Sequence, residues 1–331
     1  MRKALVLGLI VTNTIFVFSC NSGEATTKVN GHAGKAVVAQ EHSYTCPMHP
    51  EVTGKAGDKC PKCGMALEPN TKEPVATGNY HMQFDANPSV ITPSKEVVLS
   101  FTPKKKEAPT EQVVLEVSHE KKMHLILVSD DLSWFDHVHP EATPNGSYTV
   151  KTTFPTAGKY KAYADYKPAG NAQIVDKFDI VVEGKAPAEI KFAEEKLSGI
   201  SGNYSFVLTP EKGQLQTGRP IQLVGVVNKN GQPVDANKLD DYLGAKAHIV
   251  VISLNEKEYL HVHPEVVNGR FNIQTTFDKP GIYRGWIQFN GDGKLHTIDF
   301  TLNVKQGQVV ASQKAGAGNT THGHNHSGHN H

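Results

Sequence analysis

The chain has 331 residues, of which 34 are Lys or Arg and 33 are Asp or Glu, giving a formal net charge of +1. This balance argues against a nucleic-acid-binding protein, because such proteins usually carry a basic excess. Hydrophobic residues at 38% and charged residues at 20% are typical of globular domains and exclude a chain that is disordered throughout. The length suggests two or three domains. The 17 histidines are clustered rather than scattered, and there are 4 cysteines.

The first twenty residues have the features of a targeting signal. Residues 1–3 carry two basic side chains, and residues 4–18 are almost entirely apolar but too short for a stable membrane span. The segment ends in Val-Phe-Ser-Cys at Cys20, which resembles a bacterial lipobox. The resemblance implies a signal peptide over residues 1–19, cleavage before Cys20 and attachment of a diacylglycerol to its thiol. An ordinary secretory signal with an incidental cysteine is the alternative.

A lipid anchor would hold the chain outside the cytoplasm. We therefore expect a protein of the cell envelope that faces the periplasm or the cell exterior, with the outer membrane favoured over the inner one. Residues 20–43 are mostly small and polar, which predicts a flexible tether between the anchor at Cys20 and the folded part.

The other three cysteines lie within eighteen residues, and an odd number cannot close a disulfide framework. Cys60 and Cys63 have the spacing of a metal knuckle, in which two thiolates of one tight turn reach one ion, and Gly64 relieves the backbone strain of that turn. Cys46 and His49 repeat the offset on a second arm. The four side chains form a Cys₃His set, which closes a tetrahedral site.

Two methionines flank these ligands. Met48 and Met65 add thioether sulfurs, which favour Cu(I) over harder ions, although both could instead fill hydrophobic space. For the cysteines, the alternative is a structural zinc knuckle with no role in metal traffic.

Cys-Pro-Met-His-Pro at residues 46–50, followed by Cys-Pro-x-Cys-Gly-Met-x-Leu at 60–67, resembles the small heavy-metal-binding domain of copper and silver efflux adaptors and heavy-metal P-type ATPases. The resemblance covers about residues 44–69 and implies metal binding. It does not transfer a partner's activity, because the sequence shows neither the membrane helices of a pump nor the long heptad hairpin of an adaptor.

The rest of the chain contains an internal repeat of one unit. Residues 123–129 match 247–253, and residues 135–141 match 259–265, both at an offset of 124 that becomes 123 after one deletion. Repetition of this length indicates tandem domains rather than a solenoid.

Each copy consists of short β-branched and aromatic runs between Gly, Pro and Asn turns, and Asn-Gly between such runs is a strong hairpin signal. We expect a mainly β chain: a small metal-knuckle domain, then two tandem β-sandwiches of immunoglobulin-like or cupredoxin-like type at residues 79–184 and 201–305. Residues 185–200 are the predicted linker.

The spacing of the histidines predicts which of their side chains lie close together. If 123–129 and 134–140 are antiparallel strands joined by a turn at residues 130–133, His124 lies directly opposite His139, and His137 shares their face. In the second copy the turn at residues 254–257 likewise places His248 opposite His263 with His261 beside them. A register slip of one residue would destroy either arrangement.

Three convergent neutral imidazoles suit Cu(II), Zn or Ni and leave a fourth position open. The alternative is that these histidines are structural and form hydrogen bonds across the sandwich.

The C-terminal segment, residues 306–331, carries another metal signal. Gly, Asn and Ser give it no fold of its own, and alternating imidazoles on a flexible chain chelate borderline divalent ions. The alternative is a solvated tail whose metal binding is incidental. Its five histidines are His322, His324, His326, His329 and His331.

These features favour a binding protein over an enzyme. The four separate candidate sites differ in how soft their ligand atoms are. Together they predict a lipoprotein that captures, buffers or hands over heavy metal, above all copper. We expect Cu(I) at the knuckle and Cu(II) at the histidines, with zinc as the alternative ion. Its partners would be metal ions, a membrane through the anchor and a metal efflux complex, and not nucleic acid.

Two other functions remain open. In one, the sandwiches are an interaction or adaptor module of a metal efflux complex and the knuckle is a structural zinc site. The other is a copper enzyme of superoxide dismutase type. It is disfavoured because neither copy shows a bridging histidine with an Asp-containing zinc site. Residues 70–331 contain no cysteine, which excludes a blue-copper centre there.

Overall fold

The computed structural model describes residues 44–46, 52–55, 57–62, 64, 66–69 and 79–307. Within these ranges β-strands dominate and the one helical element is the short 3₁₀ turn η1 (Ala236–Lys238), so the expected mainly β fold is confirmed. None of the described segments forms a helix with the length and apolar character needed to cross a membrane. Several predicted residues lie outside the described ranges: Cys20, Met48, His49, Cys63, Met65, His322, His324, His326, His329 and His331.

The knuckle region contains a small antiparallel sheet with strand order β2–β1–β3. Its buried centre is formed by Cys46, Cys60 and Leu67, a core far too small to hold a domain by burial alone. The strands are β1 (Tyr44–Thr45), β2 (Thr53–Gly54) and β3 (Glu68–Pro69).

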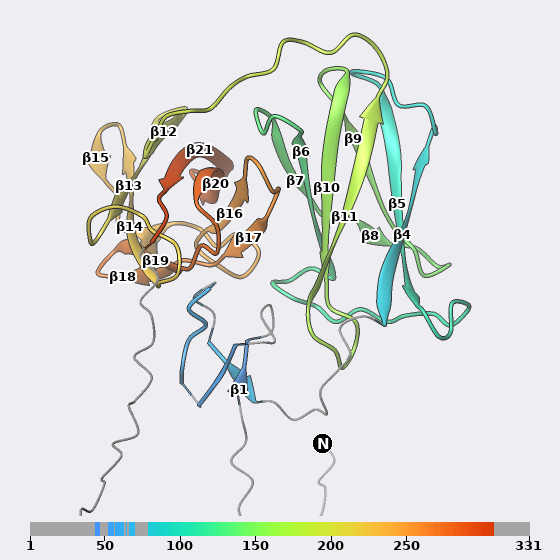
Figure 1. Ribbon diagram of the computed structural model, residues 1–331, viewed down its shortest axis with the longest axis horizontal. Coiled ribbons are helices and arrows are strands. Elements are labelled where there is room, and N and C mark those ends of the chain that lie inside the picture. Colours follow the sequence, from blue (N-terminus) through green and yellow to red (C-terminus); the bar gives the residue numbers. More distant parts are fainter. Residues whose placement is uncertain are drawn as a thin grey trace, which may run out of the picture. The chain divides into compact units, whose positions relative to one another are not determined.

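The first repeat is a sandwich of two four-stranded sheets, ordered β4–β5–β9–β8 and β11–β10–β6–β7 (Figure 1). Alternate residues of β5, such as Leu99 and Phe101, point into a core that they share with Leu125 and Leu127 of β6. The strands are β4 (Tyr80–Asn87), β5 (Glu96–Lys105), β6 (Met123–Ser129), β7 (Phe135–Val138), β8 (Glu141–Ala142), β9 (Tyr148–Thr153), β10 (Gly158–Tyr166) and β11 (Ile174–Val182).

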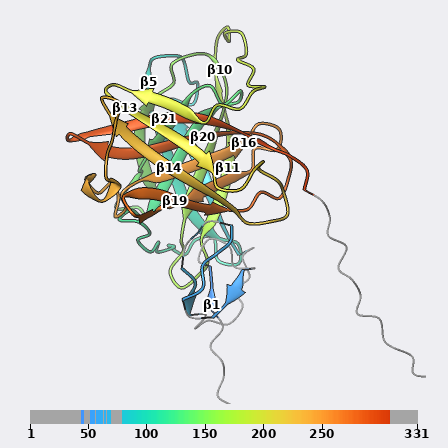
Figure 2. The ribbon, with the colours of Figure 1, turned by 90° about the vertical axis from the view of Figure 1, so that its left-hand side faces the viewer.

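The second repeat has the same plan, with one sheet ordered β12–β13–β14–β19–β18 and the other β17–β16–β20–β21. Strands β13, β14 and β19 lie side by side in Figure 2. The strands are β12 (Ser198–Ser201), β13 (Tyr204–Pro210), β14 (Ile221–Lys229), β15 (Gln232–Pro233), β16 (His248–Ser253), β17 (Tyr259–Val262), β18 (Glu265–Val267), β19 (Arg270–Thr275), β20 (Gly281–Gly291) and β21 (Lys294–Val304).

The second sandwich begins earlier than the predicted linker allows. β12 starts at Ser198, inside the segment 185–200, and packs closely on β21. A Cβ built on Gly199 would lie 2.5 Å from Ile298 Cγ2, so only glycine permits this approach. The linker therefore ends before Ser198.

Both faces of β6 and of β16 are buried. One face of each strand joins its own sandwich core, while the other packs across to the second sandwich, with Ile126 and Val128 in one apolar cluster with Val250 and Ile252. The sheets that carry the histidines therefore meet each other.

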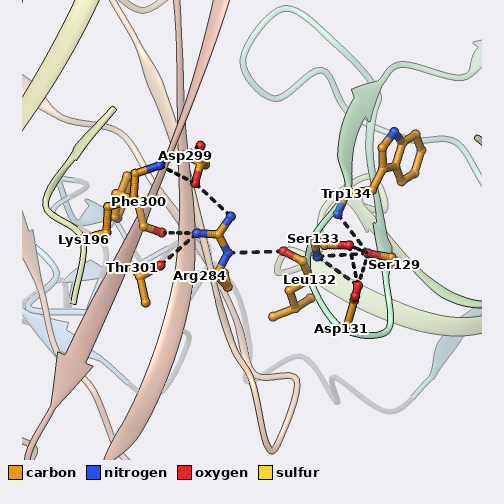
Figure 3. Close-up of polar contacts among 10 residues, drawn as sticks. All are labelled: Ser129, Asp131, Leu132, Ser133, Trp134, Lys196, Arg284, Asp299, Phe300 and Thr301. Atoms are coloured by element: carbon orange, nitrogen blue, oxygen red, sulfur yellow. Dashed lines mark hydrogen bonds and ion pairs between the residues drawn. The ribbon is translucent and has the colours of Figure 1, made fainter. Parts of the chain in front are cut away.

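A buried arginine also crosses this contact. Arg284 of β20 is 3% exposed and donates through Nε to the carbonyl of Leu132, 3.3 Å away, in the β6–β7 turn (Figure 3). Its Nη2 donates to Asp299 at 3.0 Å and its Nη1 to Thr301 at 2.8 Å. These bonds satisfy the buried guanidinium and join the turn of one repeat to the sheet of the other.

Candidate metal centre

The predicted hairpin register is confirmed in both repeats. In β6 and β7, Ile126 lies opposite His137, and in β16 and β17, Val250 lies opposite His261. These pairings are the ones that place His124 opposite His139 and His248 opposite His263.

Hydrogen bonds indicate which ring nitrogens of His124 and His137 carry the proton. His124 Nε2 lies 3.0 Å from the carbonyl oxygen of Ser118, which can only accept, so Nε2 carries the proton. In the orientation that the structure gives Gln288, its amide nitrogen points to Thr297 Oγ1 and its Oε1 accepts from His137 Nδ1 at 2.7 Å. The lone pairs of His124 and His137 are therefore on Nδ1 and Nε2, and these two atoms lie 3.2 Å apart.

Two lone pairs that face each other with no proton between them repel. The separation nevertheless matches the edge of a metal tetrahedron, since two nitrogens each about 2.0–2.1 Å from a zinc ion lie about 3.3–3.4 Å apart. The two nitrogens of His124 and His137 are thus placed as ligands of one cation would be, rather than as the donor and acceptor of a hydrogen bond.

The second trio repeats the pattern. His248 Nε2–H donates to the carbonyl of Tyr242 at 2.8 Å, and His261 Nδ1–H points to Asp165 Oδ2 at 3.4 Å. His248 Nδ1 then faces the Nε2 atoms of His261 and His263, 3.3 and 3.0 Å away. A carboxylate behind a ligating imidazole is a common support in metal sites, because it fixes the tautomer and raises ligand basicity.

The third histidine of each trio supplies an unsatisfied buried nitrogen. Within the described part of the chain, His139 Nε2 and His263 Nδ1 have no hydrogen-bond partner although both atoms are buried. Leaving such an atom unpaired costs about 1–3 kcal/mol, which a bound ion would offset for an atom that it ligates. In each trio one potential ligand atom per residue lies within 4.8 Å of the others.

Burial keeps these imidazoles neutral. Desolvation lowers the pKa of His124 and of His248 to about 4 and that of His139 to about 3. It also holds the pKa of His137, His261 and His263 well below the usual value, with neighbouring imidazoles adding to the effect. Neutral imidazole is the form that binds metal, so at neutral pH the trios need to release no proton.

The two trios are not separate sites, contrary to the expectation from sequence. The ring of His124 lies 5.6 Å from that of His261, and the ring of His137 lies 6.3 Å from that of His248, centroid to centroid. Because the sheets of the two sandwiches pack face to face, both trios belong to one histidine cluster.

Sequence reasoning missed a seventh histidine. His119 stacks on His263 of the other sandwich, with ring centroids 3.8 Å apart and planes 22° apart. It sits at a φ of 49° in the turn before β6. Its counterpart in the second repeat is Leu243, so repeat matching gave no signal for it.

Asp165 and Gln288 were also missed. They occupy equivalent places, directly across from His124 on β10 and from His248 on β20. The signal for both is a polar residue paired with a histidine on the neighbouring strand, and it can be read only once the β6–β10 and β16–β20 pairings are known.

The described part of the knuckle fits a ligand turn. Cys46 and Cys60 are fully buried, and the Gly64 N–H donates to the Cys60 carbonyl at 2.8 Å. Gly64 has a φ of +77°, so glycine is needed there, as the sequence predicted.

The knuckle turn also contacts the second sandwich. Thr275 and Thr276 donate through their hydroxyls to the carbonyls of Lys62 and Pro61, at 2.7 and 2.8 Å. A Cβ built on Gly64 would lie 4.0 Å from the carbonyl oxygen of His263. The knuckle turn therefore lies against the backbone that carries one of the cluster histidines.

Two curated relatives match only the knuckle segment. One is a copper-transporting P-type ATPase of Rhizobium leguminosarum bv. viciae, 60% identical over 35 residues, which are 11% of this chain and 4% of the relative. The other is a copper-exporting P-type ATPase of Legionella pneumophila subsp. pneumophila, 68% identical over 28 residues, or 8% of this chain and 4% of the relative. The chain thus spans a small fraction of either relative.

Among solved structures, the three N-terminal domains of the highly immunogenic outer capsid protein of bacteriophage RB49 match with 12% identity and a TM-score of 0.20. The match covers 68% of this chain and 59% of that one. A TM-score of this size supports no conclusion about function.

Family descriptions account for most of the chain. Residues 43–70 match the heavy metal binding domain. Residues 75–184 and 199–306 each match the domain of unknown function DUF8832, and these two matches together cover more than half of the chain. The protein therefore belongs to the DUF8832 family, with two copies of that domain behind a segment that matches the heavy metal binding domain.

Proposed function

We propose that this protein captures and buffers copper in the cell envelope and hands it on, as part of heavy-metal homeostasis or resistance. The observation that carries the proposal is that, in both repeats, two imidazole nitrogens whose rings donate their protons elsewhere face each other 3.2–3.3 Å apart. The match of residues 43–70 to a heavy metal binding domain supports it from an independent segment.

The ligand chemistry assigns different ions to the two regions. Thiolates and thioethers are soft donors that select Cu(I), while neutral imidazoles suit Cu(II) or Zn. The knuckle segment is also the part that is similar to two proteins named as copper-transporting or copper-exporting ATPases. We therefore assign Cu(I) to the knuckle and Cu(II) or Zn to the histidine cluster.

Handover within the chain is supported by the contact between the knuckle turn and the second sandwich. The turn that contains Lys62 is bonded to Thr275 and lies beside the backbone of His263. An ion leaving the thiolates would start next to the histidine cluster and would enter it in the oxidation state in which it left, as Cu(I) or Zn, because imidazole nitrogen binds copper and zinc alike. This argues for binding and transfer, and we propose no catalytic reaction.

The lipid anchor at Cys20 is part of the same proposal. An anchor would keep the metal sites at a membrane surface, close to a metal efflux complex in that membrane. It rests on the lipobox-like sequence alone.

The test is native mass spectrometry with metal analysis on protein purified from its metal-exposed host. We expect copper in excess of one ion per chain and an N-terminal mass that includes a diacylglycerol on Cys20. Zinc alone, at one ion per chain and lost in Cys60→Ser, would instead favour an adaptor with a structural zinc knuckle. An unmodified Cys20 would remove the anchor from the proposal.

A further inference from the structure

Each sandwich orients a histidine of the other sandwich. Asp165 of the first repeat faces His261 of the second at 3.4 Å, and Gln288 of the second repeat accepts from His137 of the first at 2.7 Å. Asp165 and His261 are 0% and 1% exposed. The tautomers of His137 and His261 are therefore each set by a residue of the opposite sandwich.

The packing around these contacts is reciprocal as well. Phe135 of the first repeat stacks on Trp286 of the second, and Tyr259 of the second stacks on Tyr163 of the first. Phe135 and Tyr259 occupy equivalent positions, as do Tyr163 and Trp286. The interface thus has the form of an isologous dimer contact within one chain, in which the same patch is used twice.

His119 breaks this symmetry. It extends from the first repeat to the second trio, where its ring lies 3.8 Å from that of His263 and 6.1 Å from that of His248. The position equivalent to His119 in the second repeat is a leucine, which offers no ligand atom to the first trio. His119 therefore adds a fourth imidazole to the second trio by stacking on His263, while its ring lies 6.2 Å from that of His124 in the first trio.

We propose that the two histidine trios form one two-metal centre that is complete only when the sandwiches are docked, with His119 of the first sandwich stacked on His263 and holding the ring orientation of that ligand of the second ion. This inference rests on the proposed role of the trios in metal binding. Asp165 and Gln288 are positioning residues, each acting on the ion held by the opposite sandwich.

The two ions are then coupled through the interface. Binding at one trio favours the docked arrangement, which orients the ligands of the other trio, while the repulsion between two divalent ions in one buried cluster acts against the second ion. Couplings of this kind are usually about 5- to 150-fold in affinity.

The experiment uses the full chain with competing sites silenced, here called the reference chain. It carries Cys60→Ser and Cys63→Ser, and asparagine in place of the five tail histidines His322, His324, His326, His329 and His331. The probe is Cu(II) alone. We expect two ions per chain, with magnetic dipolar broadening in the electron paramagnetic resonance spectrum. At one equivalent, we expect the fraction of singly loaded chains to differ from the half that independent equal sites would give.

Crossed variants test the positioning residues. His139→Ala leaves only the second trio intact and His263→Ala leaves only the first. In the His139→Ala chain, Asp165→Asn should lower Cu(II) affinity about 10- to 100-fold, the usual cost of losing such a support, but it should have no effect in the His263→Ala chain. Gln288→Ala should show the opposite dependence. The control is Asp179→Asn, an exposed carboxylate of the first repeat paired with Lys161, which should change neither affinity.

The outcomes separate this inference from the proposed function. Two Cu(II) ions with unbroadened spectra, or an Asp165→Asn effect confined to the first trio, would overturn the shared centre while leaving metal binding intact. A reference chain that binds neither Cu(II) nor Zn would overturn both.

Discussion

The ring of Phe135 stacks on the indole of Trp286 with centroids 4.6 Å apart and planes 13° apart, and this pair joins two domains that the sequence presents as separate. Both residues belong to the apolar cluster between the sandwiches. The interface that holds the histidine cluster is therefore built from the outward faces of the two histidine-bearing sheets.

Replacing Trp286 should weaken the contact between the two sandwiches, so that they no longer unfold together. Trp286→Ala removes a buried aromatic ring, so we expect a loss of about 3–5 kcal/mol in the free energy of unfolding and two resolved calorimetric transitions in place of one. Trp134→Ala is the control, because that ring packs in the core of the first sandwich. It should lower the stability without resolving the transitions. A single transition in Trp286→Ala would show that other contacts maintain the docking.

Acid should destabilise the metal-free protein in a defined window. Burial lowers the pKa of His124 and His248 to about 4, whereas the unfolded chain takes up these protons near 6.5. Below pH 6.5 the unfolded state therefore binds more protons, and each histidine removes about 1.4 kcal/mol of stability per pH unit until its folded pKa is reached. Urea unfolding with a chelator at pH 7.5 and pH 5.5 measures this loss. A double variant, His124→Asn with His248→Asn, should show a shallower pH dependence, and equal slopes would contradict the assignment.

The knuckle should depend on its thiolates while the sandwiches do not. Cys60→Ser with Cys63→Ser removes two of four predicted ligands, so tight binding of one Cu(I) or Zn ion per knuckle should be lost. The sandwiches have their own cores and should keep their melting temperature. Cu(I) titration against a competing chelator, together with circular dichroism, checks both points. Unchanged tight Cu(I) stoichiometry would refute the ligand assignment.

The hairpin registers could be predicted because they are local. The turn of residues 130–133 and the alternation of side chains together determine which residues of β6 and β7 face each other, and the result is Ile126 opposite His137. Nothing comparable specifies which outer faces of two domains meet. The unbroken burial along β6 and β16 reflects that contact, since a strand covered on both faces has a continuous apolar run rather than an alternating one.

His119 and Asp165 could not be assigned by the same reasoning. His119 is placed by a left-handed turn, and it reaches His263 only because the domains dock. Asp165 stands opposite His124 on its own sheet, yet it faces His261 across the interface. Both roles depend on tertiary contacts that spacing along the chain does not encode.

The histidine-rich tail should add metal capacity without adding stability. Deleting residues 321–331 removes the five histidines of the tail and no apolar side chain, so we expect fewer bound divalent ions at neutral pH and an unchanged melting temperature. Equilibrium dialysis against Zn with metal analysis, on the full and the shortened chain, measures the difference. Equal metal counts would show that the tail does not chelate.

The roles of His139 and His263 can be distinguished by melting experiments with and without metal. If their rings serve only packing, His139→Ala and His263→Ala should lower the melting temperature of the metal-free protein. If they are ligands, the metal-free His139→Ala variant should melt close to the parent, because His139 Nε2 has no partner to lose in the described structure. The metal-free His263→Ala variant should melt somewhat lower in either case, because the ring of His263 also stacks on His119, so for His263 only the metal-induced shift is decisive. The stabilisation by Cu(II) or Zn should instead shrink in each variant, since a ligand that binds only the folded state adds RT ln(1 + [L]/Kd). The parent for this series carries Cys60→Ser, Cys63→Ser and asparagine at the five tail histidines, so that only the cluster binds. An identical metal-induced shift in the parent and both variants would rule out these two residues as ligands.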